Sequence, residues 1–465
     1  MKQNEIYIKT AETMTATELR ASLTLATIFF LRMLGLFMIL PVFALYADNL
    51  EGVTPLLIGV ALGIYGLTQA IFQIPFGMLS DRIGRKPIIL MGLIIFAAGS
   101  GLAAESDTIL GIIVGRSVQG AGAIAAAAMA LAADLTREEQ RTKAMAIIGI
   151  SIGLAFATAL VASPILEAWV GVPGIFWLTV VLAIIAIAVL YLFVPQPVRS
   201  RFHRDAETAP GELKVVLTNT QLLRLDLGIL LLHLILTASF VALPLALRNE
   251  AGLPASEHWQ VYLPVLILSV GIMLPFLILA EKYRVMKQVF VGAVFILMLS
   301  LFGLSLWHTT LLAIFLMLLA FFAAFNFLEA SLPSLISRTA PPDQKGSALG
   351  VYSTSQFLGT FIGGALGGWL FGQFGYSGVF LLGAIAAFVW LGVALSMPNL
   401  RHLTSHMINV GRITQAQAQQ LVEQLTQVAG VAEAVVIAED EVAYLKVDRK
   451  ALDNDALREI SLRKE

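Results

Sequence analysis

The sequence contains no cysteine among its 465 residues, which excludes disulfides, thiolate metal sites and cysteine nucleophiles. Charged residues are scarce as well: they make up 13% of the chain, compared with about 25% in soluble domains. Hydrophobic residues make up 58%. This imbalance is typical of a protein that crosses a membrane many times.

The sequence lacks the motifs of several kinds of chemistry. There is no Gly-x-x-x-x-Gly-Lys-Ser/Thr loop, so nothing in the sequence indicates an ATP-driven pump. The sequence also shows no cluster of metal ligands, no pairing of a nucleophile with a base, and no basic patch for nucleic acid. We therefore expect a protein that is not an enzyme, with no cofactor, no metal and no nucleic-acid partner.

Long apolar runs fill most of the chain. A membrane-spanning helix needs about 20 apolar residues, and twelve runs approach or exceed that length. The first run is longer than the hydrophobic core of a signal peptide, so we expect it to remain as a helix in the lipid bilayer. The predicted spans are 22–46, 56–78, 87–104, 108–133, 143–165, 173–195, 222–247, 259–281, 286–306, 310–336, 345–371 and 376–397.

Lysine and arginine are unevenly distributed among the loops between these spans. The loops after odd-numbered spans hold only Arg248 as a basic residue, among several acidic ones. Because basic loops stay in the cytoplasm, we expect both termini on the cytoplasmic side. The loops after even-numbered spans hold Arg82, Arg85, Lys86, Arg137, Arg141, Lys143, Arg199, Arg201, Arg204, Lys214, Lys282, Arg284, Lys287, Arg338 and Lys345.

Two polar segments divide the chain into parts. The first contains several prolines, which rule out a continuous helix, and it separates two six-helix halves. Residues 274–282 repeat the pattern of residues 74–82, which indicates that the two halves are related. The predicted parts are a first bundle at 1–195, a cytoplasmic linker at 196–221, a second bundle at 222–397, a linker at 398–406 and a small cytoplasmic domain at 407–465.

The last part is polar and predicts a small α+β domain. Its expected order is strand, helix, strand, strand, helix, which indicates a ferredoxin-like sandwich. The layout resembles heavy-metal-associated domains, but the cysteine pair is missing, so soft-metal binding is not expected. A domain of this size is marginally stable alone, and we expect it to dock or to pair. The predicted elements are strands at 407–411, 431–438 and 442–447 and helices at 414–429 and 451–462, with Thr414 as the cap of the first helix.

One charged turn separates the uncharged runs 56–76 and 87–104. Its glycines allow two helix ends to approach and turn, and its charges fix the side of the membrane on which the turn lies. The spacing Gly-x-x-x-Asp-Arg-x-Gly-Arg-Lys resembles the signature loop of the major facilitator superfamily. The residues of this motif are Gly77, Asp81, Arg82, Gly84, Arg85 and Lys86.

This resemblance implies an all-α membrane protein with the twelve-helix facilitator fold, built from two six-helix bundles, in a bacterial inner membrane. It implies alternating access, with a small-molecule substrate and protons as partners. Residues 34–41 are similar to the drug:proton antiporter branch, whereas residues 159–168 have lost most glycines of that branch's antiport signature. The resemblance also implies that Asp81 contacts the start of the eleventh span in the outward-open state, with Arg85 and Asp134 as a charge relay.

Two arginines fall inside predicted spans, where a charged side chain is costly and indicates a functional site by default. Arg116 and Gln119 lie in a run that resembles the superfamily's fourth-helix signature Arg-x-x-Gln-Gly-x-Gly. Arg116 is alternatively a residue that holds neighbouring backbone carbonyls. Arg32, in the first span, faces either a central cavity or a polar network that packs helices.

Glu329 is the only carboxylate that we place well inside a span. Burial favours the neutral acid, so this residue is a candidate proton carrier; the alternative is a glutamate paired with an arginine or capped by hydroxyl groups. His233 is a second proton candidate, or else a histidine that is only hydrogen-bonded. The further cavity candidates, for which structural roles are equally open, are Tyr65, Gln69, Asn326, Tyr352 and Gln356.

Two functions therefore remain open. The first is a secondary active transporter, with proton-coupled efflux of a drug-like or metabolite substrate. The second is a transporter-derived sensor or a regulated transporter of an anionic metabolite, in which the C-terminal domain binds a ligand or partner. The two arginines inside spans are compatible with an anionic substrate, and the appended domain is compatible with a sensor.

Overall fold

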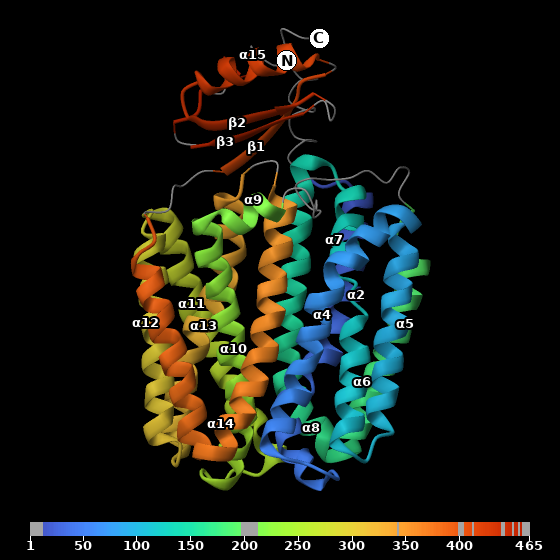
Figure 1. Cartoon of the computed structure of the whole chain (residues 1–465), viewed down its shortest axis with the longest axis vertical. Helices are drawn as coiled ribbons and strands as arrows, with labels where there is room; N and C mark the ends of the chain where they lie inside the picture. Colours follow the sequence, from blue (N-terminus) through green and yellow to red (C-terminus); the bar gives the residue numbers. More distant parts are fainter. Residues whose placement is uncertain are drawn as a thin grey trace.

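The computed structural model describes residues 13–196, 213–341, 344–398, 404–411, 413–438, 442–448, 451–453 and 456–457. A long bundle of helices carries a small α+β domain at one end (Figure 1). We call this end of the bundle the domain end and the opposite end the far end.

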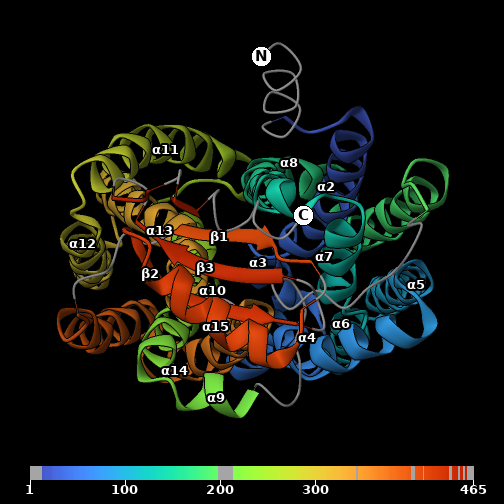
Figure 2. The same ribbon diagram turned by 90° about the horizontal axis from the view of Figure 1, so that it is seen from above.

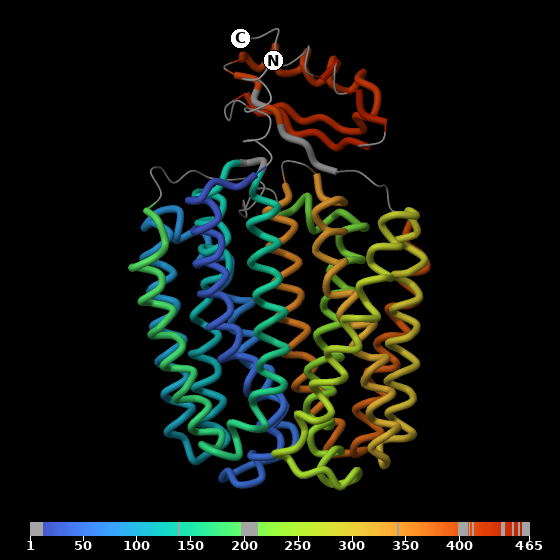
Figure 3. Tube along the Cα trace, turned by 180° about the vertical axis from the view of Figure 1, so that it is seen from behind, coloured from blue at the N-terminus to red at the C-terminus, as the bar shows by residue number. Residues whose placement is uncertain are grey.

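The first bundle consists of α2 (Ala16–Phe37), α3 (Phe43–Tyr46), η1 (Ala47–Asn49), α4 (Pro55–Ile83), α5 (Arg85–Ala104), α6 (Ile109–Ala121), α7 (Ala125–Asp134) and α8 (Glu138–Leu192). After α9 (Leu213–Thr218), the second consists of α10 (Thr220–Asn249), η2 (Ala255–Glu257), α11 (Trp259–Lys282), α12 (Met286–Trp307), α13 (Leu311–Thr339) and α14 (Lys345–Leu395). Figure 3 shows the two bundles side by side, the first from blue to green and the second from yellow-green to orange.

The described helices cross a membrane twelve times. Ten are long and apolar enough to span it, but the spans that contain α8 and α14 have 53 and 51 residues. Each would extend over about 75 Å or more, against about 30 Å of hydrocarbon. Both helices break at a glycine with positive φ, Gly171 (φ 66°) and Gly375 (φ 62°), so each makes two crossings. Ten spans and these two additional crossings give the predicted twelve.

Several predicted boundaries are wrong. The first span (22–46) begins earlier, at Ala16, where Thr15 and Glu18 form a capping box, and its helix ends at Phe37 before a turn that contains Pro41. The fourth span (108–133) is interrupted between α6 and α7, at Gly122. The predicted linker at 196–221 lies mostly outside the described residues, and its remainder contains α9 and the start of α10.

The two bundles share a hydrophobic core only toward the far end. One cluster of buried side chains includes residues of both bundles, such as Phe43 of α3 and Phe240 of α10. The other buried cluster, which includes Leu25, Phe96 and Leu131, belongs to the first bundle. The bundles are therefore joined at the far end and separate at the domain end.

Glycines make this junction close. A Cβ atom at Gly364 of α14 would overlap the carbonyl oxygen of Gly59 on α4, and one at Gly368 would overlap that of Pro55. The other glycine face of α14, at Gly359, Gly363 and Gly367, packs on the backbone of α10. These glycines therefore serve close packing of helices.

The small domain contains β1 (Thr404–Asn409), α15 (Gln415–Thr426), β2 (Val431–Ile437) and β3 (Val442–Val447). The antiparallel sheet has the order β1-β3-β2, as in a split βαβ unit. Thr414 caps α15 as predicted, but the first strand begins at Thr404, three residues before the predicted start. The predicted second helix (451–462) lies mostly outside the described residues.

The sheet lies above the domain end of the second bundle (Figure 2). Arg284, in the turn between α11 and α12, bonds the two carboxylate oxygens of Asp448 at 2.9 and 3.2 Å. Lys446 of β3 donates to the carbonyl oxygen of Thr339, the last residue of α13, at 3.3 Å. A cation at a helix C-terminus is favourable because the last carbonyls lack partners within the helix.

The glycine junction generates a test. Gly364→Leu should push α4 and α14 apart, so that a cysteine introduced at cavity residue Leu40 reacts several times faster with a membrane-impermeant maleimide supplied from the far end. Because the chain has no cysteine of its own, the introduced one reports alone. The control is Gly392→Leu on the same helix, where an added Cβ would meet nothing within 4 Å. Equal labelling rates in the two variants would contradict the junction's role.

Candidate functional site

A cavity of about 2550 Å³ lies between the two bundles. Its lining runs from Leu40, Ile165 and Leu263 in the interior to Lys345 at the domain end, where Tyr444 of β3 also contributes. The glycine junction of α4 and α14 closes the far end. The cavity is therefore accessible from the domain end only, within the described part of the chain.

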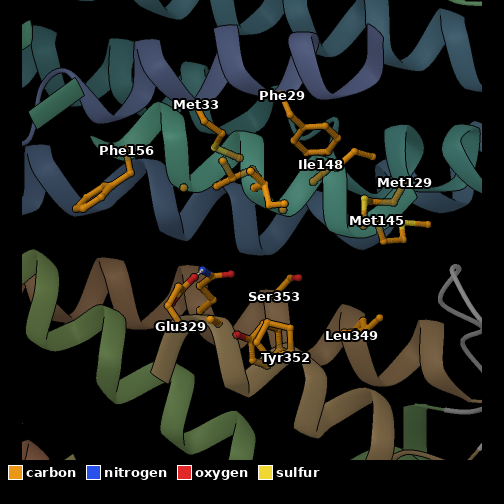
Figure 4. A pocket seen from close by; sticks show the side chains of 18 of the residues that line it. Phe29, Met33, Met129, Met145, Ile148, Phe156, Glu329, Leu349, Tyr352 and Ser353 are labelled. Carbon is orange, nitrogen blue, oxygen red and sulfur yellow. Dashed lines mark hydrogen bonds between the residues drawn. The ribbon is translucent and has the colours of Figure 1, made fainter. Parts of the chain in front are cut away.

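The two walls of the cavity differ in chemistry (Figure 4). The wall from the second bundle carries Glu329, Tyr352 and Ser353, with Leu349 nearer the domain end. The facing wall, from the first bundle, is mainly apolar at this level and includes Phe29, Met33, Met129, Met145, Ile148 and Phe156, although Tyr65, Gln73 and Arg116 also line it. Aromatic and methionine side chains adapt to apolar molecules of varied shape. The site thus combines one adaptable apolar wall with one polar wall.

A polar network on the second bundle joins three helices. The Gln356 amide nitrogen on α14 donates to Glu329 Oε1 on α13 at 3.3 Å and lies 2.8 Å from His233 Nε2 on α10. His233 Nδ1 lies 3.9 Å from Glu329 Oε2. The Glu329 side chain is 37% exposed, toward the cavity, and no arginine pairs with it among the described residues. The predicted candidates Glu329, His233 and Gln356 are therefore brought together.

Tyr352 and Asn326 lie beside this network. Both line the cavity, and the Asn326 amide donates to Ser269 Oγ at 3.0 Å. The Tyr352 hydroxyl is buried and has no hydrogen-bond partner among the described residues. These two predicted candidates belong to the polar wall.

Arg32 occupies a different environment. It is fully buried in the first bundle, does not line the cavity, and donates to Gln69 Oε1 at 2.8 Å and to the Gly122 carbonyl oxygen at 3.0 Å. The Tyr65 hydroxyl also donates to Gln69, at 3.2 Å. These contacts agree with the second alternative for Arg32, a polar network that packs helices. The bond to the Gly122 carbonyl oxygen lies at the break between α6 and α7.

Arg116 holds backbone carbonyls of α4, at Ala61 and Leu62, each at 3.3 Å. It also donates to Gln119 at 2.7 Å, and Gln119 donates to Ser100 on α5. Arg116 is only 2% exposed, although it borders the cavity. Both membrane arginines thus direct their donors to the interior of the first bundle.

The charged turn at the domain end forms an ion-pair cluster. Arg85 pairs with Asp81 and with Asp134 of α7, the latter at 3.3 Å, and it donates to Ser80 Oγ at 2.8 Å. Lys86 donates to the Val194 carbonyl oxygen at 2.7 Å. Gly84 separates α4 from α5 with φ 104°, a conformation that glycine adopts without strain. Gly77 and Asp81 line the cavity mouth, and Arg82, the neighbour of Asp81, is exposed.

One buried acid was missed from the sequence. Asp226 of α10 is 4% exposed, although it lies near the start of its span and not well inside it as Glu329 does. Asp226 lies close to the predicted start of its span and therefore resembled a boundary charge. The signal that identifies it is its spacing of seven residues from His233, which places both on one face of a helix.

Comparisons with known proteins agree with this architecture. A model of the Major Facilitator Superfamily matches residues 25–364 and 326–407. The chain is 49% identical over 439 residues to the inner membrane transport protein YajR of Escherichia coli (strain K12), covering 94% of this chain and 96% of that protein. It is 27% identical over 351 residues to the multidrug resistance protein MdtH of Proteus mirabilis (strain HI4320), covering 73% and 84% respectively.

A solved structure has the same fold. It is a bacterial homologue of the human lysosomal transporter Spinster, in an inward-facing and occupied conformation. It aligns with a TM-score of 0.69 at 13% identity and covers 82% of this chain and 97% of that one. The chain therefore belongs to the major facilitator superfamily, as a multi-pass membrane transporter and not an enzyme.

Proposed function

We propose that this protein is a secondary active transporter that exports a drug-like or metabolite substrate by alternating access, driven by protons. The observation that carries the proposal is a cavity open at one end and closed at the other, with Glu329 in its wall. Two related bundles that rock about a central site are the common basis of alternating access.

The coupling argument rests on the neighbours of Glu329. Among the described residues its polar contacts are with Gln356 and His233, and neither supplies a permanent positive charge. A proton or a cationic group of the substrate can therefore neutralise the carboxylate, and the two compete for the same oxygen atoms. Competition of this kind is sufficient for exchange of a proton against a substrate.

The walls indicate the substrate class. An apolar wall faces a polar wall with one carboxyl group, which fits an amphipathic molecule that has an apolar body and a basic or hydrogen-bonding group (Figure 4). The multidrug resistance protein among the relatives is consistent with such a molecule. The anionic alternative has less support, because Arg32 and Arg116 are held by groups of the first bundle.

A regulated transporter is the second candidate function. The small domain contacts the turn after α11 and the end of α13, and Tyr444 lies at the cavity mouth. A ligand or partner on this domain would act directly on cavity access. The domain is then a regulatory module that docks on its own transporter.

We infer that the domain end faces the cytoplasm of a bacterium, so that the described conformation is inward-open. The basic loops lie at this end, and the relative YajR is named an inner membrane protein. A reporter enzyme that is active only in the periplasm, fused after Glu465, should be silent in intact cells. The same reporter fused within the loop at Asp107 should be active, and reversed activities would overturn the orientation.

The central test concerns Glu329. Glu329→Gln should abolish flux of a fluorescent lipophilic cation driven by a pH gradient in proteoliposomes, because the amide cannot bind and release the proton. Binding of the same cation, measured without a gradient, should be weakened much less. Glu257→Gln, at an exposed position of η2, is the matched control. Full coupled flux in Glu329→Gln would exclude Glu329 as the proton carrier.

The charged turn at residues 77–87 is proposed to be a conformational switch. In the inward-open state described here Asp81 pairs with Arg85, whereas in the outward-open state it would meet the N-terminus of α14. A carboxylate at a helix N-terminus contributes about 0.3–1 kcal/mol when exposed and about 2 kcal/mol when partly buried. The contact would favour the outward-open state because it exists only there.

Asp81→Asn should therefore shift the population toward the inward-open state, by up to about thirtyfold if the contact is partly buried. Distances between spin labels on the two bundles at the domain end should lengthen. Asp107→Asn, in a far-end loop, serves as the control and should leave the distances unchanged. An identical distance distribution in Asp81→Asn and the parent would reduce the turn to an anchor of topology.

A further inference from the structure

A second buried carboxyl group lies outside the network around Glu329. Asp226 is 4% exposed, and neither of its carboxylate oxygens has a hydrogen-bond partner among the described residues. It does not line the cavity. An ionised carboxylate is strongly disfavoured in such surroundings unless a cation or several donors hold it. The side chain therefore requires either a counter-ion or a proton.

No hydrogen bond or ion pair joins Asp226 to a cation among the described residues. Arg224, two residues away on α10, directs its guanidinium to the Ser396 carbonyl oxygen at 3.0 Å. Arg338 of α13 pairs with Glu281 of α11 at 2.7 Å. The remaining cation of α10, Arg248, lies at the far end of that helix and is 3.6 Å from Asp48. A proton is the remaining way to neutralise Asp226.

The elements packed on α10 bring other uncharged or titratable groups toward this region. Helix α14 contributes Tyr352, whose hydroxyl is also without a partner, and α13 contributes Glu329. Helix α9 contributes the apolar Val216, which is buried. Asp226 thus lies among apolar groups, with Tyr352 as its titratable neighbour on the adjacent helix.

The register of α10 and α14 places these groups in order. Both helices begin at the domain end, and Gln356 meets His233 at 2.8 Å. Asp226 precedes His233 by two turns and Tyr352 precedes Gln356 by one, so they lie about 10 Å and about 6 Å closer to the domain end. The backbones of the two helices meet at Leu230 and Gly359 and at Leu234 and Gly363, so Asp226 and Tyr352 both lie on the domain side of His233.

We propose that Asp226 is a second proton-binding site, located on the cytoplasmic side of His233 and Glu329 and electrostatically coupled to Glu329. This inference rests on the proposed proton coupling at Glu329. The proton comes from cytoplasmic water and returns to it, so the step needs no oxidant, reductant or other reactant. Because the charge of one buried carboxyl group acts on the other, the protonation of one changes the titration of the other.

Infrared titration of the full chain in lipid membranes tests the site directly, because a protonated carboxyl group has its own carbonyl stretch. The parent should show acid-form bands from an aspartate and a glutamate. Asp226→Asn should remove the first, and Glu329→Gln should remove the second. In Asp226→Asn the remaining glutamate band should titrate about one pH unit lower, since a neighbouring negative charge is gone.

The aspartate band can also be assigned in the unsubstituted protein by labelling its aspartates with an isotope, which shifts their carbonyl stretch. This experiment does not depend on whether a variant folds. A labelled parent with no isotope-sensitive acid band would overturn the site. A folded Asp226→Asn variant with an unshifted glutamate titration would overturn the coupling between the two sites. These titrations need no substrate, so they test the second site separately from transport. If the aspartate band is present but flux is not driven by protons, Asp226 still binds a proton and the proposed transport mechanism is wrong.

Discussion

The membrane interior supplies no hydrogen-bond partners, so each polar group in the bundles must be satisfied by the protein or by water in the cavity. This constraint divides the polar residues of the chain into two sets. Arg32 and Arg116 reach backbone carbonyls and glutamine side chains, and they join α4, α5 and α6 into a rigid first bundle. The polar groups of the second bundle instead surround a carboxyl group whose charge is not permanently balanced.

The asymmetry has a functional consequence. A fixed positive charge in a buried network contributes to structure, because its hydrogen bonds join neighbouring helices. A carboxyl group without a permanent cation changes its charge when a proton or a basic substrate arrives. Among the described residues, Glu329 of the second bundle is the cavity-lining carboxyl group without a permanent cation, and apolar side chains of the first bundle face it.

The closed end of the cavity depends on backbone contact. At Gly59, Gly364 and Gly368 the two helices meet without intervening side chains, so the junction has few rotamers to order. At the domain end, ionic groups replace this contact: Arg85 joins Asp81 and Asp134 within the first bundle. The small domain binds the other bundle at the same end, through Arg284 and Lys446. Charge thus governs the open end of the cavity, and close packing governs the closed end.

The sequence by itself determined the twelve crossings, the two bundles and the small α+β domain, because hydrophobic length and turn chemistry are local properties of the chain. It also identified Glu329, His233 and Gln356 as candidates, because polar residues inside apolar runs are conspicuous. Only the tertiary structure decided that Arg32 serves packing, that Asp226 is buried and that α4 meets α14 at glycines. These outcomes depend on which helices are neighbours in the folded bundle. The spacing of residues along one helix does not specify which neighbouring helix its side chains contact.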